Sequence, residues 1–400
     1  MQTILMSGGH LSPLLAMAEE FRRRGDWTVA VAGRRYAFDA ARDIESFEYR
    51  SISSMGIPFY PVDAPRFPGN AKDYLSYTIS FIQAVVQTMK ILRAVKPTCF
   101  LSFGGYVSVP VGVACRMYAV PIFIHEQTHV LGRANRMLTP WARMVFTSWK
   151  KTRRLDMDRY ADKSEYTGLP LREDIRSAKT DNGLHKPSGE LKKFIGLSET
   201  GKKLPVLFVT GGSTGAHQIN RLIASSLPDL LNTYRIVHQC GESHFHDYER
   251  LSELNDSLTS SLQNRYFLRK FFNAKDTAYL MRTAGILIGR SGANTVAEIA
   301  YTGIPSLLLP LAWAADDEQL LNAQFLSNRR AARIIADEDI APSRFLEVLN
   351  EMQGAYASLK KHASSLYSSP DIAVHAMAHR RIADSIERWC RNHRDSHDAV

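Results

Sequence analysis

Short apolar runs alternate with segments of helical periodicity along the first half of the chain. Apolar runs of about four to eight residues bounded by Gly or Pro are typical of buried strands, whereas apolar residues recurring every three or four positions indicate helices packed on them. Strands that alternate with helices predict a parallel sheet with right-handed crossovers, and so an α/β fold. The predicted strands of this half are residues 3–6, 27–32, 57–62, 99–102, 121–124 and 144–147.

The second half repeats this alternation. Its helices are predicted at residues 217–226 and 294–301, and the latter closes at Gly303 with Pro305 beyond it. The tail, residues 372–390, predicts a helix with no strand after it, and we expect it to pack back on the first half. The predicted strands of this half are residues 206–210, 235–239, 265–268, 284–288, 306–309 and 332–335.

The chain is too long for one hydrophobic core. It has 400 residues, of which 45% are apolar and 22% are charged, as in soluble globular proteins. We therefore predict two domains: residues 1–164 together with the helix at about 370–390, and residues 165–369. The apolar stretch 100–124 is long enough for a membrane span, but Gly104, Pro110 and Arg116 interrupt it, and we reject a transmembrane helix.

The net charge of +10 favours acidic partners: a nucleotide, a phospholipid surface or nucleic acid. Nucleic acid is not expected, because the basic residues are dispersed and no recognition module is present. Residues 74–95 have apolar side chains at the helical period, which predicts a helix with most of this stripe in the core. The mixture of aromatic and basic residues from Phe67 to Lys90 leaves a second interpretation open, an edge that meets an anionic membrane.

The four cysteines are far apart and include no CxxC pair or metal-ligand spacing. We therefore expect a reducing compartment. Residues 1–14 lack the charged start and the long apolar run of a signal peptide.

Two turns of small residues follow predicted strands of the second half, and each opens a helix: residues 211–216 (GGSTGA) and 289–292 (GRSG). Backbone N–H groups at such a helix start, with the positive end of the helix dipole, favour a phosphate. One such turn is equally consistent with an ordinary strand–helix connection, but two of them predict a diphosphate held between two helix N-termini. A Walker-type loop is excluded because no Gly-Lys-Ser/Thr ending follows, and the dinucleotide fingerprint matches poorly. Glu298, one turn into the second helix, is placed to accept hydrogen bonds from a sugar's hydroxyl pair.

Polar residues also end two predicted strands of the first half. His10 follows the first strand at a helix start, and residues 125–127 (HEQ) follow the strand at 121–124. The carboxyl ends of parallel strands are where α/β proteins bind ligands, although a histidine near a turn is often structural. Residues 125–129 (HEQTH) have the spacing of a zinc motif, but they leave a strand and run into Gly132 instead of lying within a helix, so we expect no metal.

Seven motifs, in order and at family spacing, resemble those of the MurG-type UDP-N-acetylglucosamine transferases of peptidoglycan synthesis. The likeness runs from Ile4 to about Trp389. The resemblance implies the GT-B architecture, two Rossmann-like parallel-sheet domains that face each other across a cleft. The motifs are residues 7–13 (SGGHLSP), 103–106 (FGGY), 125–127 (HEQ), 168–172 (GLPLR), 211–216 (GGSTGA), 290–298 (RSGANTVAE) and 319–323 (QLLNA).

The resemblance implies an inverting transfer of N-acetylglucosamine from UDP-N-acetylglucosamine to the muramyl 4-hydroxyl of an undecaprenyl-diphosphate-linked muramyl-pentapeptide. Such an enzyme is bacterial, lies peripherally on the anionic cytoplasmic leaflet of the cell membrane, and serves cell-wall biogenesis, cell shape and cell division. We expect no cofactor, because helix N-termini and Arg172 suffice to stabilise the leaving diphosphate without a metal. Two alternatives stay open: a hydrolysing UDP-N-acetylglucosamine epimerase of the same architecture, and a non-catalytic nucleotide-sugar-binding protein.

The resemblance also implies site residues, position by position. Either His10 or Glu126 is the base for the acceptor hydroxyl, and the sequence does not choose between them. The remaining acceptor residues are Ser7, Gly8, Gly9, Gly104, Gly105, Tyr106, Gln127 and Thr128. The donor residues are Arg172, Gly212, Ser213, Ser291, Ala293, Asn294 and Thr295 at the diphosphate, Glu298 at the ribose, the backbone of Phe271 and Phe272 at uracil, and Gln319 at the sugar.

The chain departs from the family pattern at several of these motifs. Met6 and Ser7 stand where Gly and Thr are usual, and Thr128 replaces an Asn. Leu169 replaces the Asn of Gly-Asn-Pro, and Glu318 stands where His or Gln is usual. These changes point to a divergent lineage or an altered acceptor and leave the fold prediction unchanged.

Overall fold

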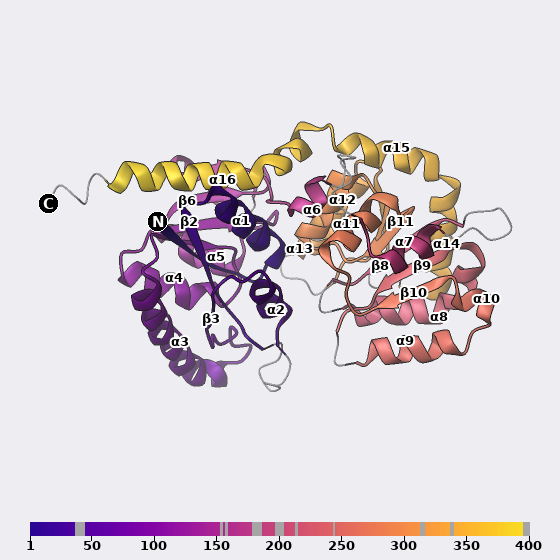
Figure 1. Cartoon of the computed structure of the whole chain (residues 1–400), viewed down its shortest axis with the longest axis horizontal. Helices are drawn as coiled ribbons and strands as arrows, with labels where there is room; N and C mark the ends of the chain where they lie inside the picture. The colour runs from indigo at the N-terminus through magenta and orange to yellow at the C-terminus, as the bar shows by residue number, and fades with distance from the viewer. Residues whose placement is uncertain are drawn as a thin grey trace. The chain divides into compact units, whose positions relative to one another are not determined.

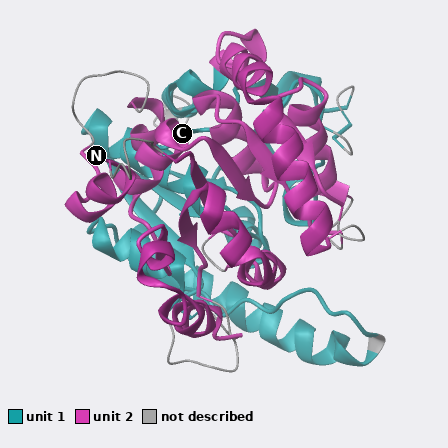
Figure 2. Cartoon of the chain, turned by 90° about the vertical axis from the view of Figure 1, so that its right-hand side faces the viewer, with its two compact units in different colours: residues 1–172, 374–400 teal, residues 173–373 magenta. Residues whose placement is uncertain are grey.

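Each half of the chain builds one parallel β-sheet covered by helices (Figure 1). The computed structural model describes residues 1–36, 45–152, 155–156, 159–177, 186–196, 204–212, 215–242, 245–312, 317–336 and 340–394. The chain divides into two compact units (Figure 2). Unit 1 comprises Met1–Arg172 and Val374–Val400, and unit 2 comprises Glu173–Ala373.

The sheet of unit 1 has the strand order β3-β2-β1-β4-β5-β6-β7, and its paired strands are parallel. The strands are β1 (Gln2–Ser7), β2 (Trp27–Gly33), β3 (Phe59–Pro61), β4 (Cys99–Ser102), β5 (Ile122–Glu126), β6 (Ala142–Thr147) and β7 (Ser164–Tyr166). The α-helices are α1 (Leu11–Arg24), α2 (Phe47–Ser54), α3 (Tyr74–Val95), α4 (Ser108–Met117), α5 (Arg133–Leu138) and most of α16 (Pro370–Arg394). Short 3₁₀ helices are η1 (Ala71–Asp73), η2 (Thr139–Trp141) and η3 (Ala161–Lys163).

Alternate residues of the central strands feed two separate cores. Ile4 and Met6 of β1 face the core under α1 and α16, whereas Leu5 faces the core under α3 and α4. The tail helix therefore packs on unit 1, as predicted, through apolar residues such as Ile382 and Ile386. Arg24 at the end of α1 reinforces this packing by ion pairs with Asp384 (2.6 Å) and Glu387 (2.7 Å) of α16.

The sheet of unit 2 has the order β10-β9-β8-β11-β12-β13, and its paired strands are also parallel. The strands are β8 (Val206–Thr210), β9 (Arg235–Gln239), β10 (Tyr266–Arg269), β11 (Ile286–Gly289), β12 (Ser306–Leu308) and β13 (Ala332–Ile334). The helices are α6 (Glu173–Ser177), α7 (Gly189–Gly196), α8 (His217–Thr233), α9 (Asp247–Asp256), α10 (Ser260–Gln263), α11 (Ala274–Thr283), α12 (Ala293–Thr302), α13 (Glu318–Ser327), α14 (Pro342–Gly354) and α15 (Tyr356–Leu366).

In both sheets the direction in which successive strands are added reverses once. The candidate sites lie at these reversals. In unit 1 the chain runs from β1 outward to β3 and then resumes on the other side at β4. In unit 2 it runs from β8 outward to β10 and resumes at β11. At such a switch point the loops diverge at the carboxyl ends of the strands and leave room for a ligand. Four of the predicted motifs follow β1, β4, β8 and β11, the strands that flank the two switch points, and residues 125–127 end the next strand of unit 1, β5.

Two predictions about organisation are wrong in detail. The boundary after residue 164 cuts through β7, whose Glu165 pairs with Phe146 of β6, so the chain stays in unit 1 as far as Arg172. The apolar stripe of α3 is not mainly core. Its carboxyl-terminal half buries residues such as Val85 and Leu92, but an apolar row nearer its start is exposed. That row comprises Leu75 (75% exposed), Ile79 (52%), Ile82 (56%) and Val86 (46%).

The apolar stretch 100–124 forms β4, a glycine turn, α4 and β5, in agreement with the sequence. In the part of the chain that is described, none of the helices combines the length and the apolar character that crossing a membrane requires. All four cysteines are buried and carry free thiols.

Candidate active site

Two glycine-rich turns meet at the carboxyl ends of β1 and β4. The amide of Gly9 donates to the carbonyl of Gly104 over 3.1 Å, and the amide of Phe103 donates to the carbonyl of Ser7 over 2.8 Å. A Cβ on Gly8 would lie 2.5 Å from the Cβ of Phe103, so a larger residue does not fit. The structure therefore brings the predicted acceptor residues of both turns together at one edge of the sheet.

Gly105 and Tyr106 complete this edge. Gly105 has a φ of +80°, and a Cβ on it would lie 2.7 Å from the amide nitrogen of Gly9. The hydroxyl of Tyr106 is buried and has no hydrogen-bond partner among the described residues. Leaving such a group unpaired costs about 1–3 kcal/mol. A ligand that supplies an acceptor here would remove that cost.

Glu126 ends β5 with both carboxylate oxygens engaged. Oε1 accepts from the amide (3.1 Å) and the hydroxyl (3.0 Å) of Thr128. Oε2 accepts from the amide of Gly132 (3.0 Å) and from the side-chain amide of Asn135 (2.9 Å). The side chain is only 2% exposed, and these donors compensate for its desolvation. Since a carboxylate has about four acceptor positions, none is left for a substrate proton.

Asn135 on α5 is a residue that sequence reasoning missed. Its amide donates to Glu126 and, over 3.2 Å, to the carbonyl of His125, while its Oδ1 accepts from the hydroxyl of Ser102 at 3.1 Å. The side chain thus ties the end of β4 to the end of β5. The available signal was a polar residue three positions after Gly132, in the segment that follows the HEQ motif.

His10 caps the start of α1 at the same edge, without a hydrogen bond from its side chain to the helix. Burial lowers the pKa of His10 below its ordinary value of 6.5, and the negative charge of Glu126 acts in the opposite direction. His10 is therefore neutral near pH 7, and the proton it accepts would be stabilised by the carboxylate beside it. Of the two predicted bases, Glu126 already accepts four hydrogen bonds, whereas the ring of His10 makes no capping hydrogen bond to α1. His10 is therefore the better candidate for the base.

His125 has a structural environment. Its Nε2 lies 3.1 Å from the carbonyl oxygen of Gly168, and its Nδ1 lies 3.2 Å from Nε2 of Gln127. These partners require a neutral ring with the hydrogen on Nε2. Burial lowers the pKa of His125 to about 4, which keeps it neutral. Gln127 is fully buried, and its Oε1 has no partner among the described residues.

The three side chains with zinc-motif spacing do not converge. His125 is directed to Gly168, Glu126 faces the loop that leads to Asn135, and the ring of His129 stacks on Trp149 with the centroids 4.2 Å apart. Over the described ranges, no group of three or more His, Cys, Asp or Glu side chains is arranged to hold a metal ion.

The turn after β8 leaves open space beside its backbone. Gly212 and Gly215 have φ values of +80° and +74°. A Cβ on Gly215 would lie 2.3 Å from the carbonyl oxygen of Cys240, whereas no atom of the described residues beyond its chain neighbours lies within 4 Å of the Cβ position of Gly212. The amide of Gly212 donates to the hydroxyl of Thr210 (3.2 Å) and its carbonyl accepts from Gly215 (3.3 Å), so a ligand finds open space beside this turn without displacing these bonds. Ser213, predicted to contact the diphosphate, lies outside the described residues.

The turn after β11 is its neighbour, because Gly289 pairs with Thr210 at the ends of the two strands. Gly292 is the N-cap residue of α12 and, having no side chain, makes no capping hydrogen bond to the helix. The first N–H groups of a helix have no partner within it, and in α12 this first turn includes Ala293, Asn294 and Thr295.

Two side chains of α12 add polar atoms at this helix start. Oδ1 of Asn294 is buried without a partner among the described residues, which marks it as a further ligand contact. Glu298 follows one turn later and is 9% exposed. The first two turns of α12 thus carry both the predicted phosphate contact and the predicted ribose contact.

Gln239, at the end of β9, was also missed. Its Nε2 donates to the hydroxyl of Thr210 (3.3 Å) and to the carbonyl of Gly212 (3.2 Å), and its Oε1 accepts from the amide of Phe272 (3.1 Å). It therefore joins the predicted phosphate turn to the predicted uracil loop at Phe271 and Phe272. Its place at the carboxyl end of a strand beside β8 was the only signal in the sequence.

Three other residues predicted to bind the donor lie in different surroundings. Ser291 is fully buried, and its hydroxyl donates to the carbonyl of Gln319 over 2.7 Å, so it holds the turn from within. Gln319 is half-buried, and its Oε1 accepts from the amide of Leu311 at 3.1 Å. Arg172 is the last residue of unit 1 and does not belong to the elements that build the donor edge.

The two halves of the chain match the two domains of one enzyme family. Residues 6–147 match the glycosyltransferase family 28 N-terminal domain, and residues 206–376 match the glycosyltransferase family 28 C-terminal domain. A UDP-N-acetylglucosamine--N-acetylmuramyl-(pentapeptide) pyrophosphoryl-undecaprenol N-acetylglucosamine transferase of Pseudomonas putida is 32% identical over 352 residues, covering 86% of each chain. The chain belongs to glycosyltransferase family 28.

A second family 28 relative has the same printed name. It comes from Halothermothrix orenii and is 30% identical over 363 residues, which cover 90% of this chain and 91% of the relative. The resemblance seen in the sequence is therefore confirmed, and this family 28 protein is a glycosyltransferase.

Solved structures confirm the predicted architecture of this glycosyltransferase. MurG of Acinetobacter baumannii is similar with a TM-score of 0.64 at 23% identity, over 97% of this chain and 100% of that chain. A UDP-GlcNAc 2-epimerase from Neisseria meningitidis reaches a TM-score of 0.62 at 13% identity, over 97% and 100%. These identities show the fold alone, two Rossmann-like domains of the GT-B class. The epimerase alternative thus rests on the fold only, whereas the relatives with 30–32% identity are transferases by name.

Proposed function

We propose that the protein transfers N-acetylglucosamine from UDP-N-acetylglucosamine to the muramyl 4-hydroxyl of a lipid-linked muramyl-pentapeptide, with inversion at the anomeric carbon. The observation that carries this proposal is the pair of adjacent turns after β8 and β11, one open beside its backbone and one an uncapped helix start. The names of relatives that align over most of the chain supply the donor and the acceptor.

On this proposal the donor diphosphate binds to main-chain N–H groups of unit 2. The N-terminus of α12 presents N–H groups to the negative charge that develops when UDP leaves, and the open space beside Gly212 lets the phosphates approach the turn after β8. Asn294 contributes its side-chain amide to the same region, and Glu298 accepts hydrogen bonds from the ribose hydroxyls. No ion is needed for this stabilisation, because helix ends and amides supply partial positive charge at fixed positions.

The acceptor hydroxyl is deprotonated by His10 as it attacks the anomeric carbon. The transition state has oxocarbenium character, so proton removal and departure of UDP must be supported together. Glu126 stabilises the imidazolium that forms and holds the loop from Thr128 to Asn135 in place. Tyr106 and Gln127, whose buried Oη and Oε1 atoms lack partners among the described residues, are the candidates for contacts to the acceptor.

The direct test is an assay with purified protein, labelled UDP-N-acetylglucosamine and a muramyl-pentapeptide lipid analogue. We expect labelled sugar in the lipid product and release of UDP in equal amount. Incubation with the donor alone separates the alternatives: formation of the manno epimer would identify an epimerase. Donor binding without turnover under either condition would identify a non-catalytic nucleotide-sugar-binding protein.

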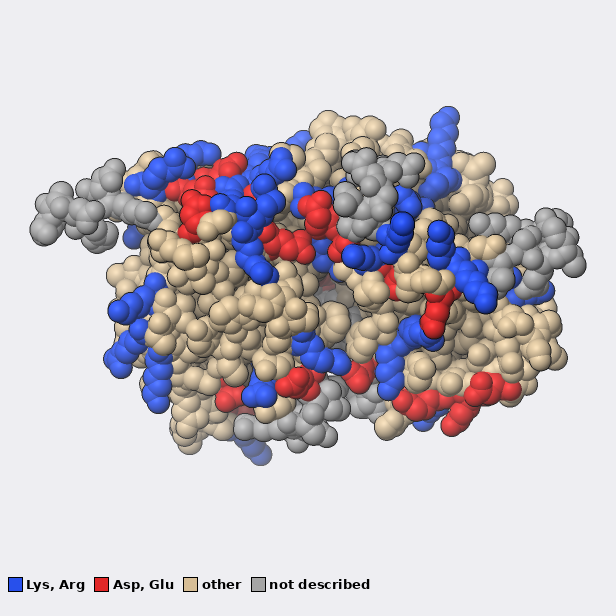
Figure 3. Space-filling model, viewed as in Figure 1, with Lys and Arg blue, Asp and Glu red and all other residues tan. Residues whose placement is uncertain are grey.

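We propose that the acceptor is reached at an anionic cytoplasmic leaflet of a bacterial membrane, through α3. The exposed row from Leu75 to Val86 lies on one face of this helix, and Figure 2 shows the amino-terminal end of α3 projecting from the rest of unit 1. Residues 74–95 include no Asp or Glu. Figure 3 shows Lys and Arg side chains along the outer edge of unit 1, where α3 and α4 lie. An apolar row flanked by cations is typical of a peripheral membrane surface.

The double substitution Ile79→Ser with Ile82→Ser is expected to weaken binding to vesicles that contain anionic phospholipid on the order of tenfold. Each exposed isoleucine loses part of the roughly 1.5–3 kcal/mol that burying its side chain would contribute. Vesicle co-sedimentation at several salt concentrations measures the effect, with Met377→Ser, an exposed apolar residue on α16, as the control. Equal binding of the unmodified protein to neutral and anionic vesicles at every ionic strength would contradict the proposal.

A further inference from the structure

A cavity of about 560 Å³ lies in unit 1 at the amino ends of β5 and β6. Its lining includes Pro121 and Ile122 at the start of β5 and Ala142 at the start of β6. This is the sheet edge opposite to Glu126, which ends β5 four residues after Ile122 in a strand that rises about 3.3 Å per residue. The cavity is therefore separate from the candidate active site.

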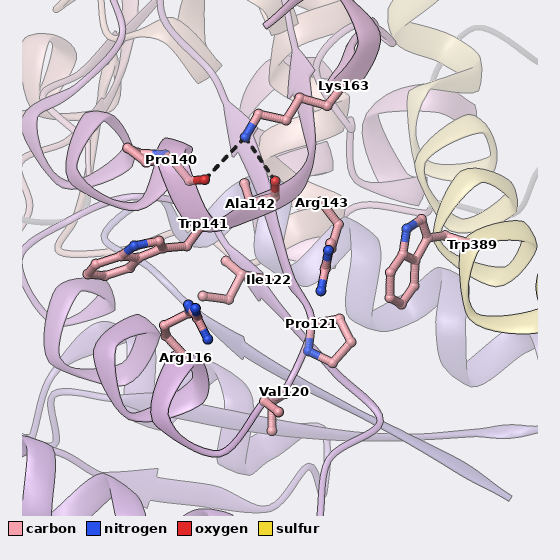
Figure 4. Close-up of a pocket in the computed structure, with 11 residues that line it drawn as sticks. Arg116, Val120, Pro121, Ile122, Pro140, Trp141, Ala142, Arg143, Lys163 and Trp389 are labelled. Carbon is pink, nitrogen blue, oxygen red and sulfur yellow. Dashed lines mark hydrogen bonds between the residues drawn. The ribbon is translucent and has the colours of Figure 1, made fainter. Parts of the chain in front are cut away.

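Three cations line the cavity: Arg116 from α4, Arg143 from β6 and Lys163 from η3. None of the residues that line it is Asp or Glu. Within the described part of the chain, neither guanidinium has an ion-pair partner, and Arg143 instead lies 5.5 Å from the ring centre of Trp389. In the view of Figure 4, Arg143 lies beside the indole of Trp389 and Arg116 lies near that of Trp141, with Ile122 and Pro121 between the two arginines.

Lys163 has a different part in this arrangement. Its ammonium donates to the carbonyls of Thr139 (2.8 Å) and Ala142 (3.1 Å), so it fixes the 3₁₀ turn that carries Trp141. Burial lowers the pKa of Lys163 below 10.5, and the nearby charges of Arg159 and Arg143 lower it further. An anion in the cavity would relieve the repulsion between Lys163 and Arg143, which both line it. Arg116 and Arg143 would then make the direct contacts with that anion.

The cavity is larger than a simple ion requires, and its walls include two indole rings. Trp389 is held by Phe123, with ring centroids 5.6 Å apart, so its indole is a fixed wall. Trp141 is 42% exposed at the other side, and Met117 beside Arg116 is 62% exposed. A cavity in the usual range for small ligands, about 300–1,000 Å³, leaves room for an apolar or planar group beside the charged one.

We propose that this cavity binds a phosphate ester that carries an apolar or aromatic group. Two guanidinium groups offer paired N–H donors that match the oxygens of a phosphate, and the indoles offer flat apolar surface for the group attached to it. The shared chemistry fits either a phospholipid headgroup at a membrane surface or a free phosphate ester.

The first arm of the test uses phenyl phosphate as the probe, in isothermal titration of the full chain. We expect saturable binding of one molecule per chain, tighter than inorganic phosphate and tighter than benzoate, which has the ring but a single charge. Arg143→Gln and Arg116→Gln are each expected to weaken this binding about tenfold or more. Lys361→Gln, an exposed cation on α15 of unit 2, is the charge-matched control and is expected to change nothing.

The second arm identifies the source of the ester by binding to phosphatidylglycerol vesicles. If Arg143→Gln weakens vesicle binding more than Lys361→Gln does, the occupant is a phospholipid headgroup. If it weakens only phenyl phosphate binding, the occupant is a free ester. Absence of saturable phenyl phosphate binding, or equal affinities in Arg143→Gln, Arg116→Gln and Lys361→Gln, would overturn the proposal. Both arginines are exposed, so thermal unfolding of these variants is expected to match the unmodified protein.

Discussion

Replacement of His10 by Ala is expected to lower kcat for sugar transfer by about 10²- to 10⁴-fold, the usual contribution of a positioned general base. The unmodified enzyme should lose activity as the pH falls, because the imidazole must be neutral to accept the hydroxyl proton. Burial lowers the pKa of His10 below 6.5, so the midpoint of this loss should lie below pH 6.5. The measurement is the pH dependence of kcat/KM for both proteins.

The fall of kcat/KM at low pH, the acid limb of the pH profile, should be absent from the residual activity of His10→Ala. His362→Ala, at the surface of α15 in unit 2, is the matched control and should keep both the rate and the limb. An unchanged acid limb in His10→Ala would assign the base to another residue.

The substitution Glu126→Gln is expected to lower both stability and activity. The carboxylate accepts four hydrogen bonds in a buried position, and an amide has only one oxygen to meet them. The NH₂ group of the new glutamine would face N–H or O–H donors that the replaced carboxylate oxygen had accepted from. Losing charged hydrogen bonds of about 1.5–3 kcal/mol each should lower the Tm of unit 1 by roughly 5–10 °C.

This result separates a positioning role from a catalytic one. If Glu126 positions the loop and supports His10, the variant unfolds at lower temperature and its residual activity keeps an acid limb. If Glu126 were the base, the variant would also unfold at lower temperature, but its residual activity would lose the acid limb. Glu347→Gln, exposed on α14, serves as the control for loss of one carboxylate.

Most strands and the first helix were predictable because their signals are local. The strand at 206–210 has the predicted bounds, and α1 ends at Gly25, whose φ of +85° follows three arginines, as its sequence indicates. Local signals also fixed the turns, since the glycines that allow close backbone approach stand directly after the strands. The helix from His217 runs beyond its predicted end because Leu227 and Leu230 are buried, which sustains it through Pro228.

The remaining errors concern relations between distant segments. Periodicity marked the apolar stripe of α3, but a period does not tell whether the stripe faces a core or the solvent. The pairing of β7 with β6 and the positions of Asn135 and Gln239 arise from hydrogen bonds between strand ends that lie apart in sequence. The cationic cavity combines side chains from α4, β6, η3 and α16, and no sequence motif predicts it.

The account depends on one claim above the others: that the donor nucleotide is held by main-chain groups of unit 2 at the switch point between β8 and β11. A crystal structure of the protein with UDP tests it directly. The diphosphate is predicted beside Gly212 and the N-terminus of α12, with the ribose hydroxyls on Glu298 and no metal ion between the phosphates. UDP bound at any other place, or held through a metal ion, would contradict the account.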